Sequence, residues 1–226
     1  MSFTYKLVME LIYLAILSAG FAYGAVKLFR KGQPLYFQLY VMGCGARVVE
    51  RMIVCTTVIC GLTDMNVSVG NFLGMFSLGL FILSANRGTL DGIVDDRSDP
   101  RNKKARRLAI IVPAFNMVAC FIITGLYMVN VSVFTGLVIF VGAQPAIIAS
   151  YYCAKHLLLM DEMQLLKATR PCNILAIAAC GVGLINQLLS SLISSEIVLA
   201  YIHIIVYALP AVMVVYAVKG AEKWKA

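Results

Sequence analysis

The sequence predicts an all-α polytopic membrane protein with seven transmembrane helices, and three observations lead to this fold class. Hydrophobic residues make up 61% of the 226 residues and charged residues only 13%. The mean hydropathy of +0.87 lies far outside the range of soluble domains. The apolar residues also occur in runs of about 20, the length that crosses a hydrocarbon core roughly 30 Å thick. The runs cover residues 5–28, 36–61, 66–85, 108–128, 131–154, 172–193 and 197–218.

The connections between these runs are short, so we expect one transmembrane domain over residues 1–226 and no soluble domain. Positive charge predicts its orientation, because cytoplasmic loops carry an excess of Lys and Arg. Sixteen of the 19 Lys and Arg residues follow the first, third and fifth runs or lie in the C-terminal tail, whereas Lys6 lies on the opposite side. We therefore expect an outside N-terminus and a cytoplasmic C-terminus in the plasma membrane.

The net charge of +8 follows from this topology. It gives weak support for contact with anionic lipids of the bilayer, and it does not indicate nucleic-acid binding. The seven cysteines lie mostly within spans and form no CxxC motif, so we expect packing residues and neither disulfides nor a metal site. No metal, cofactor or catalytic residue is predicted.

The first span enters from outside and carries one acidic residue, Glu10, roughly 7 Å below its outer end. Further along, Gly20 and Gly24 are spaced so that a neighbouring helix can approach closely. The second span is the unusual one, because it carries Arg47, Glu50 and Arg51 near its middle.

The spacing of Arg47, Glu50 and Arg51 places them on one face of a helix. A charge at the bilayer centre costs at least roughly 2.5–3.5 kcal/mol, so this face is expected to contact protein or water. Two interpretations stay open. In one, Glu10 and Glu50 balance both arginines in a network that only joins helices. In the other, one arginine remains available for a carboxylate or phosphate, while Glu10 or His203 binds an amine or a proton.

Polar residues in the other spans come to similar depths, counted from the outer boundary. We therefore expect them to line an internal cavity that opens to the outer face. Pro113 in the fourth span and Pro145 in the fifth are expected to kink helices beside that cavity. The predicted ligand-binding residues are Glu10, Arg47, Glu50, Arg51, Asn71, Asn186, Gln187 and His203.

The segment 86–107 is the longest stretch between spans and has four aspartates ahead of a basic run. Metal ligation by these aspartates for a diphosphate substrate is one interpretation, but a second acidic cluster is missing. We favour an acidic helix extension followed by a basic flank that faces the membrane. A docking surface for a cytoplasmic partner is the alternative.

These features favour an integral membrane sensor or ligand-binding module, receptor-like, with a pocket for a small polar or anionic molecule. The alternative is a small-solute transporter that uses the same site near the midplane, which kinked helices favour. An intramembrane enzyme is the least favoured class, because no nucleophile, base and orienting group occur at a recognisable spacing. Homo-oligomer formation is left open.

Overall fold

The computed structural model describes residues 3–62, 64–96, 98–159, 164–193 and 195–225, leaving out the side chains of residues 3, 64–69, 71, 94, 164–166, 196 and 225. Helices make up 91% of the structure, and the described residues contain no strand. The predicted all-α class is therefore confirmed.

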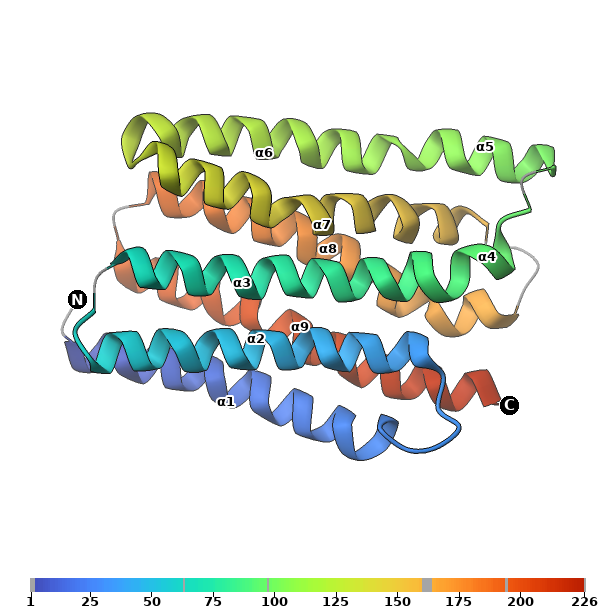
Figure 1. The fold of residues 1–226 in the computed structure, drawn as a ribbon, viewed down its shortest axis with the longest axis horizontal. Coiled ribbons are helices and arrows are strands. Elements are labelled where there is room, and N and C mark those ends of the chain that lie inside the picture. The colour runs from blue at the N-terminus through green and yellow to red at the C-terminus, as the bar shows by residue number, and fades with distance from the viewer. Residues whose placement is uncertain (1–2, 63, 97, 160–163, 194, 226) are drawn as a thin grey trace.

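Long helices run side by side along one axis, and the two chain termini lie at opposite ends of the bundle (Figure 1). The long helices are α1 (Phe3–Leu28), α2 (Leu35–Ile59), α3 (Asp64–Leu83), α6 (Ile111–Asn130), α7 (Val133–Leu158), α8 (Gln164–Leu192) and α9 (Glu196–Lys225). Between α3 and α6 the chain forms the π-helical segment η1 (Ser84–Leu90), the short α4 (Asp91–Val94) and α5 (Pro100–Ala109). We call the end where the chain begins the N-terminal end, and the other the C-terminal end.

Five helices form a closed ring, because α2 packs on α3, α3 on α7, α7 on α8, α8 on α9, and α9 on α2. Helix α1 packs outside this ring against α2 and α9, and α6 packs outside it against α7 and α8. Close approach of α1 to α9 depends on Gly20, since a Cβ there would lie 2.6 Å from Cβ of Ala211. This arrangement leaves space inside the ring.

Five helical segments are long and apolar enough to cross a membrane. They are Thr4–Leu28, Pro100–Asn130, Val133–Leu158, Lys167–Leu192 and Ile197–Trp224. Helix α2 is not among them, because it contains Arg47, Glu50 and Arg51. For α3, the side chains of residues 64–69 and 71 lie outside the described part. The structure thus supports a multi-pass membrane protein.

Several helices extend beyond the apolar runs that predicted them. Helix α8 begins at Gln164, before the predicted 172, and passes through Pro171, and α9 continues to Lys225, past 218. Helix α5 leads almost directly into α6, with Ile110 between them. Apolarity marks only the lipid-contacting part, whereas helical hydrogen bonding continues into polar flanks. The seven cysteines all lie within the described residues and none forms a disulfide.

Candidate ligand-binding site

Four charged side chains from α1 and α2 form a buried network, which we call the arginine network: Glu10, Arg47, Glu50 and Arg51. Glu50 forms ion pairs with both Arg47 and Arg51. Nη1 of Arg51 also donates to Oε2 of Glu10 at 2.7 Å. Exposed fractions are 7% for Arg47, 1% for Glu50 and 2% for Arg51. The three residues of α2 therefore share one protein-facing side, as their spacing predicts, and with all four groups ionised the network carries no net charge.

Glu50 fits into the bundle because the neighbouring helix α3 has a glycine opposite it. A Cβ at Gly74 would overlap the carboxylate of Glu50. Overpacking of this kind in a well-packed interior typically costs about 1–3 kcal/mol. Gly74 thus determines how closely α3 covers the side of the network that faces away from α1.

Aromatic side chains of α1 and α9 cover the other side of the arginine network. The guanidinium carbon of Arg51 lies 4.5 Å from the centroid of the Tyr207 ring, and that of Arg47 lies 5.0 Å from it. Tyr13 stacks on Tyr207 with ring centroids 4.9 Å apart, and His203 meets both rings edge-on. Cation–π contacts of this kind stabilise a desolvated arginine by about 2 kcal/mol.

A cavity of about 350 Å³, which we call the main cavity, lies beside the network and is lined by α1, α2, α3, α6, α7, α8 and α9. Its polar lining consists of Glu10, Arg47, Arg51, Tyr127, Thr135, Asn186, Gln187, Ser190, His203 and Tyr207. Glu10, Asn186 and His203 each lie six or seven residues from the helix end on the N-terminal side. At 1.5 Å per residue this is roughly 10 Å, so the cavity lies toward the N-terminal end of the bundle.

Two buried polar groups of this lining are incompletely hydrogen-bonded. Nε of Arg47 and Oδ1 of Asn186 have no partner among the described residues, although both residues are more than nine-tenths buried, with exposed fractions of 7% and 8%. An unsatisfied buried donor or acceptor costs about 1–3 kcal/mol. Both atoms belong to residues that line the main cavity, and each leaves a hydrogen-bonding position without a partner in the described part of the chain.

The structure brings together six of the eight residues that the sequence selected, and their ligand-binding role stays a prediction. Glu10, Arg47, Arg51, Asn186, Gln187 and His203 line the main cavity. Glu50 lies behind Arg47 and Arg51 and is not part of the lining. The side chain of Asn71 lies outside the described part of the chain.

Tyr207 contacts both arginines but is not among the residues predicted from the sequence. The spacing could have identified it, because Tyr207 follows His203 by four residues and therefore lies on the same face of α9. Tyr127 of α6 was also not selected, and it donates to the backbone carbonyl of Gln187 at 3.1 Å. No local pattern identifies that contact, because it depends on the packing of α6 against α8.

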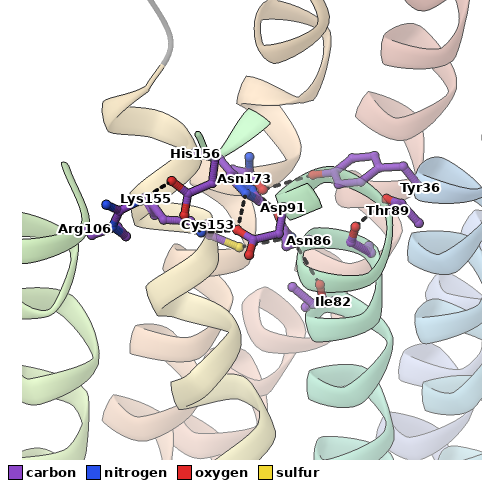
Figure 2. Close-up of polar contacts among 12 residues, drawn as sticks. Tyr36, Ile82, Asn86, Thr89, Asp91, Arg106, Cys153, Lys155, His156 and Asn173 are labelled. Carbon is purple, nitrogen blue, oxygen red and sulfur yellow. Dashed lines mark hydrogen bonds and ion pairs between the residues drawn. The ribbon is translucent and has the colours of Figure 1, made fainter. Parts of the chain in front are cut away.

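A second set of charged side chains lies toward the C-terminal end, and we call it the lysine network (Figure 2). It consists of Asp91, Asp95, Arg106, Lys155 and His156. Lys155 of α7 forms ion pairs with Asp91 and with Asp95, the latter at 3.0 Å, and Asp95 also pairs with Arg106 of α5. Lys155 is 2% exposed and His156 is fully buried. The network therefore fixes the segment after α3 to α7.

Asn86 connects the lysine network to the interior of the ring (Figure 2). Nδ1 of His156 donates to Oδ1 of Asn86 at 3.0 Å, and the amide of Asn86 donates to the hydroxyl of Tyr40 at 3.1 Å. Tyr36 in turn donates to Asn173 of α8 at 2.9 Å. These contacts join α2, η1, α7 and α8 across the C-terminal part of the ring.

Asp91 lies outside the membrane-spanning segments. Its partial burial raises the pKa of the carboxyl, but its contacts with His156 and Lys155 and the charge of Lys155 lower it more. The pKa therefore lies below its ordinary value of 3.8. Asp91 is ionised at neutral pH, which keeps the charges of the lysine network balanced.

The segment 86–107 was expected to present its aspartates as a helix extension, a metal site or a docking surface. Asp91 and Asp95 contact Lys155, so these two carboxylates act within the fold. No cluster suited to a metal ion occurs among the described residues. Binding of a cytoplasmic partner to the remaining exposed side chains, such as Asp96 and Lys103, stays a prediction.

No protein-family model, curated protein or solved structure matches this chain.

Proposed function

We propose that this chain is a seven-span plasma-membrane protein whose main cavity binds a small polar molecule with an anionic group. In this proposal the N-terminus lies outside, the C-terminus is cytoplasmic, and the protein acts as a sensor or ligand-binding module. The excess of Lys and Arg in the connections toward the C-terminal end supports this orientation. The main cavity then opens toward the outside of the cell.

The proposal rests on the position and the hydrogen bonding of Arg47. Arg47 lines the main cavity, its ion pair with Glu50 lies behind it, and its Nε has no partner within the described part of the chain. Arginine binds carboxylates and phosphates through charge-assisted hydrogen bonds, which are roughly twice as strong as neutral ones. Glu10, whose side chain is 14% exposed, lies on the same cavity and is placed to bind a positive group of a zwitterion.

The test is a binding screen with purified protein in lipid nanodiscs. Small carboxylates, phosphates and amino acids are titrated by calorimetry against the wild type and against Arg47→Gln. We expect at least one of these compounds to bind, and Arg47→Gln to weaken that binding at least tenfold, because one charge-assisted hydrogen bond contributes about 1.5–3 kcal/mol. Arg87→Gln is the matched control, since Arg87 is exposed.

Arg47→Gln also disturbs the ion pair with Glu50, so a second variant is needed. Asn186→Ala leaves the arginine network intact and removes an acceptor without a described partner from a residue that lines the main cavity. We expect weaker binding in this variant with an unchanged melting temperature. Binding that is unaffected by both substitutions would contradict the proposal.

Transport of the same molecule is the second candidate, and one feature favours it. The ring of helices is hollow toward the N-terminal end, whereas hydrogen bonds among Tyr36, Tyr40, Asn86 and Asn173 join its helices toward the other end. A site that is open on one side and closed on the other is expected of one state of an alternating-access transporter. Accumulation in proteoliposomes that is lost in Arg47→Gln would support transport, and binding without flux would contradict it.

A further inference from the structure

A second, smaller cavity of about 60 Å³ adjoins the main cavity, and we call it the apolar arm. The two share four lining residues: Met75, Leu78, Ala179 and Gly183. The apolar arm lies between α3, α7 and α8, and small side chains, among them Ala143, Ala146 and Ala176, form much of its wall. Met75 and Leu78 are the only large side chains that the two cavities share.

The apolar arm offers almost no hydrogen bonds to an occupant. Its one hydroxyl belongs to Ser150, and this group donates to the carbonyl of Ile147 at 2.6 Å. The same oxygen accepts from the side-chain amide of Asn116 at 3.3 Å. A buried water needs two to four polar partners, and cavities without them stay dry or take apolar molecules. The apolar arm therefore favours a hydrocarbon group.

The main cavity differs in chemistry from the apolar arm. Nε of Arg47 and Oδ1 of Asn186 remain without partners among the described side chains there, and both residues are more than nine-tenths buried. The combined space is thus polar and charged at one end and apolar at the other. The apolar arm measures about 60 Å³ and the main cavity about 350 Å³, so only a short apolar group fits into the apolar arm.

We propose that the ligand of the main cavity is a short-chain amphiphile. Its carboxylate or phosphate binds Arg47, and its short apolar tail occupies the apolar arm. This assignment rests on the proposed function and adds the substrate class. The whole acyl chain of a membrane phospholipid is too long for the apolar arm, so the ligand is a water-soluble molecule and not a bilayer lipid.

The experiment measures binding of acetate, butyrate, hexanoate and dodecanoate to the unmodified protein in nanodiscs, with empty nanodiscs as reference. Each methylene that enters the apolar arm contributes about fourfold in affinity. We expect the affinity to rise from acetate to hexanoate and then to stop rising at dodecanoate. Hexyl phosphate tests the alternative head group at the same chain length.

Two variants distinguish binding of the anionic head group from binding of the apolar tail. Ala176→Leu fills the apolar arm from α8 and is expected to reduce hexanoate affinity to that of acetate, with acetate itself unaffected. Ala22→Leu on the exposed face of α1 is the matched control. Arg47→Gln is expected to weaken every member of the series. If Ala176→Leu does not fold, the chain-length series on the unmodified protein still decides the outcome.

Three results would overturn the amphiphile assignment. The first is an affinity that is independent of chain length while Arg47→Gln still weakens binding, which would leave the proposed function in place. The second is no binding by any member, in which case the proposed function is judged by its own screen of polar compounds. The third is a fall in hexanoate affinity when phosphatidylglycerol is added to the nanodiscs, which would assign the site to a bilayer lipid.

Discussion

The arginine network and the lysine network contain similar charges but differ in the space around them. Each pairs two carboxylates with two strong cations, and each contains nearly fully buried members. Arg47 of the first lines a cavity of about 350 Å³. Lys155 of the second lies between Asp91, Asp95 and the ring of Tyr152, with its nitrogen 5.0 Å from the ring centroid.

This difference indicates two roles for buried charges, one in holding helices together and one in binding a ligand. A buried ion pair by itself is weak support for stability or function, because desolvation offsets its attraction. A network whose central cation is paired with two carboxylates holds elements together, as Lys155 does for the segments that carry Asp91, Asp95 and Arg106. A network that borders an open space and keeps a donor without a described protein partner, as the arginine network does, is suited to bind a ligand.

Loss of the shared carboxylate of the arginine network should have the largest effect on stability. Glu50→Gln removes the carboxylate shared by Arg47 and Arg51 and leaves the ion pair of Arg51 with Glu10, and breaking a buried pair in this way costs about 3–5 kcal/mol. For a chain of this size each kcal/mol lowers the melting temperature by roughly 2–4 °C. Thermal unfolding followed by circular dichroism measures the shift. Glu222→Gln, at an exposed position, should leave the melting temperature unchanged.

Removal of the central cation of the lysine network should have the next largest effect. Lys155→Met leaves Asp95 with Arg106, and Asp91 with His156, and the lost charged hydrogen bonds contribute about 1.5–3 kcal/mol. The cost should be smaller than for Glu50→Gln, because the side chain of Asp91 is 26% exposed and water replaces part of the interaction. Lys103→Met is the exposed control. A cost above that of Glu50→Gln would reverse the ranking of the two networks.

Closing the space behind Glu50 tests how tightly α3 covers the arginine network. Gly74→Ala should reduce the free energy of unfolding by about 1–3 kcal/mol, because the new Cβ overlaps the carboxylate. Gly125→Ala in α6 is a matched control, since nothing lies within 4 Å of the added Cβ. It should stabilise the helix by about 0.5–1 kcal/mol. Equal effects of the two substitutions would show that Glu50 has room to move.

Acidification should weaken the lysine network, and this should be the smallest of the four predicted effects on stability. The pKa of Asp91 is lowered in the folded protein, so its contribution to stability is complete above 3.8 and is lost as the pH falls through the lower, folded value. The difference in melting temperature between the wild type and Asp91→Asn, measured in a non-ionic detergent, should therefore disappear at strongly acidic pH. A difference that persists there would show that the Asn side chain perturbs packing instead.

Much of the fold was predictable because it depends on local properties of the chain. Apolar runs located the long helices, although helical hydrogen bonds extend α8 and α9 into polar flanks. The spacing of Arg47, Glu50 and Arg51 predicted one charged, protein-facing side of α2, and these side chains are buried together. Equal depth along different helices predicted that Glu10, Asn186 and His203 lie near one another, and all three line the main cavity.

Other features could not be predicted, because they depend on how helices rotate and pack. Arg47 and Glu50 lie on the same side of α2, but only packing decides that Arg47 faces the main cavity and Glu50 faces Gly74. The ion-pair partner of Asp91 could not be predicted from the sequence either. Nearby basic residues in the segment 86–107 are the obvious candidates, yet the ion pair is with Lys155, 64 residues away.

The sequence by itself determined the helical class, the apolar segments and the cost of burying three charges in α2, because hydrophobicity and helical period are properties of neighbouring residues. Only the tertiary structure decided which charges are satisfied by protein and which face open space. That outcome depends on small differences in helix rotation and side-chain volume across the ring. Lys155 is paired with both Asp91 and Asp95, whereas Arg47 keeps one nitrogen without a partner among the described residues.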